Sequence, residues 1–167
     1  NGVASKLARD AVFGKAKIKV LAELDPSSWS GDEAGAWVVE QVKRHPIKQI
    51  DAIVAANDGQ AAGIVDALAA EGIGPKRLPY ITGQDAELTA LQRIVRGEQA
   101  MTVYKPIVTE AEQAADIAVT LATGGVVTGT TLYEGVPSFI FAPRAVTVQN
   151  LTNTVVRDGL HTSAEIC

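Results

Sequence analysis

The sequence predicts an α/β fold: a doubly wound, mostly parallel sheet flanked by helices. Short apolar segments with strand character alternate with longer amphipathic segments along the chain, and this alternation is typical of βαβ units. Polar residues directly follow several strand segments, as ligand-binding residues do at the carboxyl edge of a parallel sheet. With 167 residues, 47% of them hydrophobic, the chain can bury one core or form part of a larger protein.

The sequence of the first third of the chain predicts two helices with a strand between them. Residues 2–13 form a helix without a capping residue, as though the chain began inside an element, and KIKVLAEL (17–24) forms a strand. After the loop DPSSWSGD, Asp32 is expected to cap a helix that stops at His45-Pro46, because Asp is a favoured N-cap and the residue before proline avoids helical geometry. The apolar face of this helix carries Ala34, Trp37, Val38 and Val42.

The middle third predicts two further strand–helix units. Residues 50–56 form a buried strand, and Asp58 is expected to cap the following helix, which ends at GIG (72–74). Residues 78–83 form the next strand, and its helix closes near Gly97. The residues expected to point inward are Val65, Leu68 and Ala69 in the first helix and Leu88, Leu91, Ile94 and Val95 in the second.

The last third begins with a strand at 101–105, after which Pro106 leads into an Ala-rich helix. The segment 124–135 is rich in Gly and Thr and is expected to be a long connection. A last strand is expected at 137–142, and a helix near 150–158 that finishes at Gly159.

Three phrases at predicted strand ends carry the functional signal: AANDG, TGQDA and VYKPI. They supply the amide of Asn57, the carboxylate of Asp85 and the ammonium of Lys105. An amide both donates and accepts hydrogen bonds, whereas a carboxylate accepts from two neighbouring hydroxyls at once. Trp29, in a Ser/Gly loop, offers an indole face for the C–H side of a sugar ring. These residues form a polyol-binding set more than a catalytic one.

Each of these residues also has a simpler interpretation when taken alone. Asn57 could be a turn residue, Asp85 a helix cap and Lys105 a solvated strand end. Their occurrence together at successive strand ends favours a binding site.

Several other functions are excluded by composition and motif. A net charge of −4 argues against a nucleic-acid partner. No apolar run reaches the length of a membrane span, and the N-terminus has no secretory h-region. The Asp85–Lys105 spacing is too short for a receiver domain. Phosphate-loop, dinucleotide and nucleophile-elbow motifs do not occur, and two distant histidines with the terminal Cys167 make no zinc set. The sequence predicts neither a metal nor another cofactor.

The segments IDAIVAANDGQAAGIVDAL, ITGQDAEL, RIVRGEQAMTVYKPI and VPSFIFAP resemble the substrate-binding proteins of bacterial ABC sugar importers. The resemblance covers essentially the whole chain, and TGQDAEL followed by MTVYKPI is typical of the xylose-type branch. It implies a type I periplasmic-binding fold and no enzymatic activity. By matching position it implies that Asn57, Asp85 and Lys105 bind sugar hydroxyls and that Trp29 stacks on the pyranose ring.

The resemblance also implies an incomplete, N-terminally truncated lobe arrangement. Residues 1–101 correspond to the C-terminal sugar-binding lobe, 102–137 to a crossover and a segment of the N-terminal lobe, and 138–167 to the return crossover and a C-terminal lobe helix. The implied partners are a pentose such as D-xylose and, in the intact protein, an ABC permease. The implied location is periplasmic, or extracellular and membrane-associated.

Two consequences follow for the chain by itself. It is expected to bind pentose weakly or not at all, because half a cleft leaves one sugar face in water. Apolar surface exposed by the truncation is expected to favour a homodimer. Two other functions stay open at this point: the effector-binding half of a sugar-responsive transcription regulator, and an enzyme using Asp85 and Lys105 as an acid/base pair.

Overall fold

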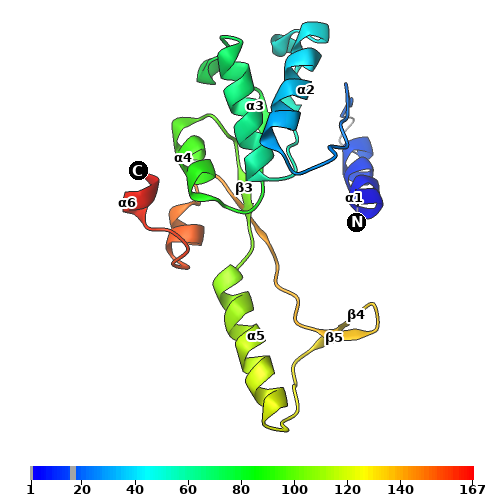
Figure 1. Ribbon diagram of the computed structural model, residues 1–167, viewed down its shortest axis with the longest axis vertical. Coiled ribbons are helices and arrows are strands. Elements are labelled where there is room, and N and C mark those ends of the chain that lie inside the picture. The colour runs from blue at the N-terminus through cyan, green and yellow to red at the C-terminus, as the bar shows by residue number, and fades with distance from the viewer. Residues whose placement is uncertain (1, 16–17) are drawn as a thin grey trace.

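The computed structural model describes residues 2–15 and 18–167 and shows a chain of helices joined by short strands (Figure 1). Its helices are α1 (Gly2–Lys15), α2 (Gly31–Arg44), α3 (Asp58–Ala70), α4 (Leu88–Arg96), α5 (Ile107–Ala122) and α6 (Ser163–Ile166), with short 3-10 turns η1 (Ile47–Gln49) and η2 (Pro75–Arg77) and a π-helical turn η3 (Thr152–Val156). Its strands are β1 (Ala52–Ile53), β2 (Tyr80–Ile81), β3 (Thr102–Tyr104), β4 (Thr131–Tyr133), β5 (Val136–Ser138) and β6 (Arg144–Val146).

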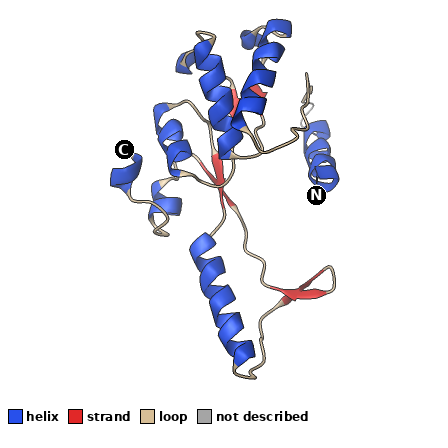
Figure 2. Cartoon of the chain, viewed as in Figure 1, coloured by secondary structure: helices blue, strands red, loops and turns tan. Residues whose placement is uncertain are grey.

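The described elements form an upper body and a lower extension (Figure 1). The upper body contains α2, α3 and α4, with η3 and α6 beside α4, whereas α5 and the β4–β5 hairpin make up the lower extension. The chain leaves the upper body after β3 and comes back into β6. Figure 2 shows how short the strands are beside the helices that surround them.

The described strands form three pairs. β1 and β2 run parallel, with Ala52 opposite Tyr80. β3 and β6 run antiparallel, with Thr102 opposite Val146, and β4 and β5 form an antiparallel hairpin. The predicted alternation of strands and helices is confirmed, with the β1 and β2 pair as its parallel part. The expectation of a buried strand over residues 50–56 is wrong, because only Ala52–Ile53 is strand and both Ala52 and Val54 are exposed.

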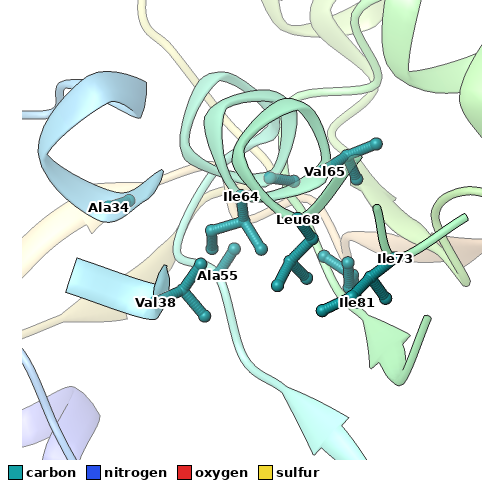
Figure 3. Packing of buried hydrophobic residues seen from close by; sticks show 9 residues of the cluster. Ala34, Val38, Ala55, Ile64, Val65, Leu68, Ile73 and Ile81 are labelled. Atoms are coloured by element: carbon teal, nitrogen blue, oxygen red, sulfur yellow. The ribbon is translucent and has the colours of Figure 1, made fainter. Parts of the chain in front are cut away.

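The first core lies between α2, α3 and the β1–β2 pair (Figure 3). Leu68 and Ile81 are almost completely buried there, as the apolar pattern predicts. The two helices approach closely: a Cβ atom added to Gly31 would lie 2.5 Å from the carbonyl oxygen of Gly59. Glycine is therefore required at the contact, because a side chain would meet backbone. The buried residues of this cluster are Ala34, Val38, Ala55, Ala61, Ile64, Val65, Leu68, Ile73 and Ile81.

A second core joins α4 to β3, β6 and the C-terminal segment. Tyr104 and Val146 are buried at its centre, and Leu91 and Ile94 reach it from α4. The predicted inward orientation of Val95 is wrong, since 43% of its side chain is exposed. Gly97 ends α4 in the left-handed conformation, as predicted.

The expected strand at 17–24 is not formed in its described part. Residues 18–24 pair with no strand, and Ile18, Val20 and Leu21 are exposed; residue 17 lies outside the described residues. A strand needs a neighbour for its backbone hydrogen bonds, and an apolar pattern alone does not supply one.

Two predicted caps are shifted toward the N-terminus. Ser30 caps α2 by accepting a hydrogen bond from the backbone of Glu33, so Asp32 lies in the first turn instead. Asn57 caps α3 by accepting from the backbone of Gln60, so Asp58 is the first helical residue. Ser, Asn and Asp are all good N-caps, and sequence preference does not separate neighbouring candidates.

The C-terminal third also differs from expectation. The connection at 124–135 contains β4, and the strand expected at 137–142 is β5 at its start and unpaired afterwards. The helix expected near 150–158 is the π-helical turn η3, followed by Gly159 with φ 75°. The short helix α6 was not predicted.

The lower extension exposes much of its apolar surface. No residue of α5 is buried, and large apolar side chains of α5 and the following segment face outward. We call this set the lower apolar surface: Ile107, Val108, Val119, Leu121, Val126, Leu132, Tyr133, Val136 and Ile140. Within the described residues, no helix is long and apolar enough to cross a membrane.

Candidate functional site

The side chains of Asp85 and Lys105 meet in an ion pair. Lys105 Nζ donates to Asp85 Oδ1 at 2.7 Å, and the two side chains are 41% and 37% exposed. Asp85 follows β2 and Lys105 directly follows β3, so the structure brings together two strand ends as the sequence predicts. A half-exposed pair of this kind keeps both charged groups available to a ligand.

Asn57 lies in a loop that is hydrogen-bonded to the loop carrying Asp85. It follows β1, and its Oδ1 accepts from the backbone nitrogen of Gln60 at 2.8 Å. The next residue, Asp58, donates its backbone N–H to the carbonyl oxygen of Gln84 at 2.9 Å. The loops that carry Asn57 and Asp85 are therefore tied to each other at adjacent strand ends.

Trp29 lies in the loop before α2, and its side chain is 70% exposed. The close contact of Gly31 with Gly59 brings this loop to the same end of the helices as Asn57. Among the described residues, no hydrogen bond or ion pair joins Trp29 to the other three predicted site residues. The indole of Trp29 is open to solvent, and its place in the site stays a prediction.

The loop that carries Asp85 has an unusual backbone. Asp85 has φ 104° and Ala86 has φ 53°, two successive residues with side chains in conformations that favour glycine. Such conformations persist only where the surroundings hold them, and they gather at functional sites.

Asp58 is the residue whose role the sequence did not reveal. It is completely buried, and its carboxylate accepts hydrogen bonds from three segments. Oδ2 accepts from the backbone of Glu87 at 3.0 Å and from Thr102 Oγ1 at 2.9 Å, while Oδ1 accepts from Gln99 Nε2 at 2.8 Å. These partners lie 29 to 44 residues away, so no local pattern could have indicated them.

Burial sets the electrostatics around Asp58. It raises the pKa of the Asp58 carboxyl, while the hydrogen bonds from Gln99, Glu87 and Thr102 and the nearby Arg93 oppose that rise. Burial likewise lowers the pKa of the Arg93 guanidinium, and the charge of Asp58 opposes this. Arg93 donates to the Asp58 backbone oxygen and to Gln99 Oε1, both at 3.1 Å. Gln60 Nε2, also buried nearby in α3, has no hydrogen-bond partner among the described residues.

A second ion pair lies where the chain crosses between the upper body and the lower extension. Arg144 of β6 makes an ion pair with Asp158, and its guanidinium lies 5.2 Å from the ring centre of Tyr104 in β3. Burial raises the pKa of the Tyr104 hydroxyl. This arrangement fixes the two crossing segments to the C-terminal part of the upper body.

The site as a whole offers hydrogen-bonding groups to a small polar ligand. A carboxylate and an ammonium meet in an ion pair, and the amide of Asn57 belongs to a loop hydrogen-bonded to the Asp85 loop; these groups suit hydroxyl recognition. Over residues 2–15 and 18–167, no three His, Cys, Asp or Glu side chains are grouped so as to hold a metal ion.

Comparisons with known proteins identify the family of this chain. The family model described as "Periplasmic binding protein domain" matches residues 1–125. The chain is 39% identical to the D-xylose-binding periplasmic protein of Haemophilus influenzae over 94% of its length, and 40% identical to that of Escherichia coli K12 over 90%. It covers 48% and 46% of those two proteins, so it spans about half the length of the curated relatives it matches.

Solved structures show the same fold. A carbohydrate transporter solute-binding protein from Chloroflexus aurantiacus, in complex with D-glucose, superposes with a TM-score of 0.68 at 28% identity, covering 82% of this chain and 42% of that one. A periplasmic ribose ABC transporter protein from Conexibacter woesei gives a TM-score of 0.71 at 22% identity over 98% of this chain and 50% of its own. The relatives from Haemophilus influenzae and Escherichia coli are named as sugar-binding proteins, which confirms the expectation that the chain is not an enzyme. The predicted fold class is also confirmed. The chain belongs to the periplasmic binding protein domain family.

Proposed function

We propose that this chain forms one wall of the sugar site in the substrate-binding component of a bacterial ABC sugar importer. The observation that carries the proposal is the Asp85–Lys105 pair, 2.7 Å apart, in a loop hydrogen-bonded to the loop that carries Asn57. The ligand is a pentose such as D-xylose, held between two lobes. The names of the relatives from Haemophilus influenzae and Escherichia coli support this choice of sugar.

Each site residue has a distinct role in the proposed site. The carboxylate of Asp85 accepts from two adjacent hydroxyls, and Lys105 both donates to the sugar and holds that carboxylate in place. Asn57 uses its Oδ1 in capping α3, so its amide nitrogen is the group that donates to the ligand. The exposed indole of Trp29 covers the apolar face of the ring.

The proposed lobe arrangement follows the boundaries expected from sequence. Residues 1–101 belong to the C-terminal lobe, 102–137 cross into the N-terminal lobe, and 138–167 return. The position of α5 and the β4–β5 hairpin away from the upper body supports this division (Figure 1). We infer that the protein acts in the periplasm, delivers its sugar to an ABC permease, and has no nucleic-acid partner.

Calorimetric titration of D-xylose into the full-length protein that contains this chain tests the proposal. Binding should be saturable, and Asp85→Asn should abolish it, because an amide cannot accept from two hydroxyls and keep the pair with Lys105. Asp51→Asn is the matched control, since Asp51 is exposed and precedes β1 at the opposite end of the strand. Equal binding by Asp85→Asn and the unaltered protein would contradict the proposal.

A further inference from the structure

We propose that Asp58 and Thr102 form a positioning pair that holds the Asp85 loop in its sugar-binding conformation without touching the sugar. Both side chains are completely buried, and Thr102 Oγ1 donates to Asp58 Oδ2 at 2.9 Å. The inference rests on the proposed sugar site and adds to it the residues that set its geometry. We call the two residues the Asp58–Thr102 pair.

The Asp85 loop needs external support. Asp85 and Ala86 both have positive φ, a backbone conformation that residues with a Cβ atom rarely hold unless the surroundings support it. A loop left to itself would relax to cheaper conformations and would move the Asp85 carboxylate. The sequence TGQDAEL has no glycine at either strained position.

Three successive backbone amides of this loop supply the support. Asp85 donates to the carbonyl oxygen of Val103 at 2.9 Å, and Ala86 donates to Thr102 Oγ1 at 3.1 Å. Glu87 donates to Asp58 Oδ2 at 3.0 Å. Two of the three acceptors are the side chains of the Asp58–Thr102 pair, and the third is the backbone next to Thr102. The hydroxyl of Thr102 accepts from the loop and donates to Asp58, so it is the central link.

The Asp58–Thr102 pair is also adjacent to the segments that carry the other two proposed sugar-binding residues, Asn57 and Lys105. Asp58 directly follows Asn57 and donates its own backbone N–H to Gln84 in the Asp85 loop. Thr102 begins β3, which ends immediately before Lys105. The segments that carry the three polar groups of the site are therefore all connected to the buried Asp58–Thr102 pair. This connection arranges the three groups before a ligand binds. Prearrangement raises affinity because less ordering is left to be done on binding.

A single isosteric change isolates this role. Thr102→Val keeps the shape of the side chain but removes both the acceptor for Ala86 and the donor to Asp58. Thr102→Ser keeps the hydroxyl. In the full-length protein, Thr102→Val should raise the Kd for D-xylose about tenfold, the effect expected from losing one or two hydrogen bonds. Thr102→Ser should restore affinity to within about threefold of the unaltered protein.

Amide hydrogen exchange in the sugar-free protein gives a readout that needs no ligand. The amides of Ala86 and Glu87 should exchange faster in Thr102→Val and stay protected in Thr102→Ser. Thr154→Val is the matched control: Thr154 is buried and its hydroxyl also bonds backbone, but in the C-terminal segment around η3. It should leave both the Kd and these two amides unchanged.

A charge exchange provides a second route should Thr102→Val fail to fold. Asp58→Asn places a donor opposite Gln99 Nε2, which is also a donor, and so should weaken sugar binding. Adding Gln99→Glu gives the new amide an acceptor and leaves an acceptor for Arg93 Nε, although it removes the bond from Gln99 Nε2 to the Met101 carbonyl oxygen. The double variant should bind D-xylose more tightly than Asp58→Asn alone.

The outcomes separate this inference from the proposed function. No binding of D-xylose by the unaltered protein overturns the proposed function. Binding by the unaltered protein with equal affinity in Thr102→Val, or no recovery in Asp58→Asn/Gln99→Glu, overturns the positioning role. Loss of affinity in Thr102→Val, recovery in Thr102→Ser and selective exposure of the Ala86 and Glu87 amides support it.

Discussion

The backbone nitrogen of Glu87 donates to Oδ2 of Asp58 at 3.0 Å, across 29 residues of sequence. This bond joins the loop before α4 to the first turn of α3. A carboxylate at the first position of a helix also complements the positive end of the helix dipole. Asp58 therefore stabilises both the start of α3 and the Asp85 loop, so a substitution of Asp58 should affect both segments.

The buried carboxyl of Asp58 should give the free energy of unfolding a distinctive pH dependence. Its pKa in the folded chain is raised by burial, so the folded state holds this proton more tightly than the unfolded state does. The stabilisation is complete below the ordinary carboxyl pKa of about 3.9 and is lost as the pH rises through the folded value. Relative to Asp58→Asn, the unaltered chain should lose stability as the pH rises from about 4.

Urea unfolding at a series of pH values between about 4 and 8 measures this difference. Asp32→Asn is the control, because Asp32 is also in the first turn of a helix but is exposed. The prediction would be contradicted if the free energy of unfolding of the unaltered chain rose, relative to that of Asp58→Asn, as the pH increased.

Lys105→Met should separate binding from stability. The Asp85–Lys105 pair is about two-fifths exposed, and pairs of this kind contribute about 0–1 kcal/mol to folding. The free energy of unfolding should change by no more than that, whereas affinity for D-xylose in the full-length protein should fall at least about tenfold. Lys48→Met, in the exposed turn η1, is the control for loss of a lysine. Unchanged affinity in Lys105→Met would remove Lys105 from the site.

The two tryptophans should report on different environments. Trp29 is 70% exposed, whereas Trp37 packs against the first core. Acrylamide should quench the fluorescence of Trp37→Phe, which keeps Trp29, several times more steeply than that of Trp29→Phe. In the full-length protein, D-xylose should protect the Trp29 signal. Similar quenching slopes for the two variants would show that the Trp29 loop is packed, contrary to the structure.

The contact between α2 and α3 should not tolerate a methyl group. A Cβ atom at Gly63 would overlap with the carbonyl oxygen of Gly31. Overpacking of this kind costs about 1–3 kcal/mol. Gly63→Ala should lower the free energy of unfolding by that amount in urea titration. Gly74→Ala, with no atom within 4 Å of its added Cβ and φ −78°, should stay within about 0.5 kcal/mol.

The lower apolar surface should promote self-association of this chain. Leu132 and Tyr133 are 72% and 59% exposed on the β4–β5 hairpin. Sedimentation velocity over a range of concentrations should detect a homodimer, and Leu132→Lys should shift it toward monomer. Val148→Lys, at an exposed position outside the hairpin, is the control. A chain that stays monomeric at all concentrations would contradict this prediction.

Local sequence signals predicted most helices and the three strand ends of the site. The inward orientation of Leu68 and Leu91 is confirmed, since helical period is a local property, whereas Ala69 and Val95 were expected inward and are exposed. Gly97 was identifiable as a helix end because its left-handed conformation suits only a few residue types. The ion pair of Asp85 with Lys105 followed from placing both residues at strand ends.

Features that depend on distant partners were not predictable. The apolar segment 18–24 has strand character but no neighbouring strand among the described residues. Asp58 has the sequence signature of a helix cap, and its actual partners at Gln99 and Thr102 come from other elements. The positive φ of Asp85 could not be predicted either, because the residue at that position is not a glycine. In each case the deciding interaction is tertiary.

The pairing of β3 with β6 has a consequence for the order in which the chain folds during synthesis. Thr102 cannot meet Val146 until α5 and the hairpin have been made, whereas the first core needs nothing beyond Ile81. At about 5–20 residues per second, translation leaves an interval on the order of seconds between the two. The residues of α2 and α3 are therefore synthesised before β3 can gain its partner strand, and the crossing between the two regions closes only once β6 has been made.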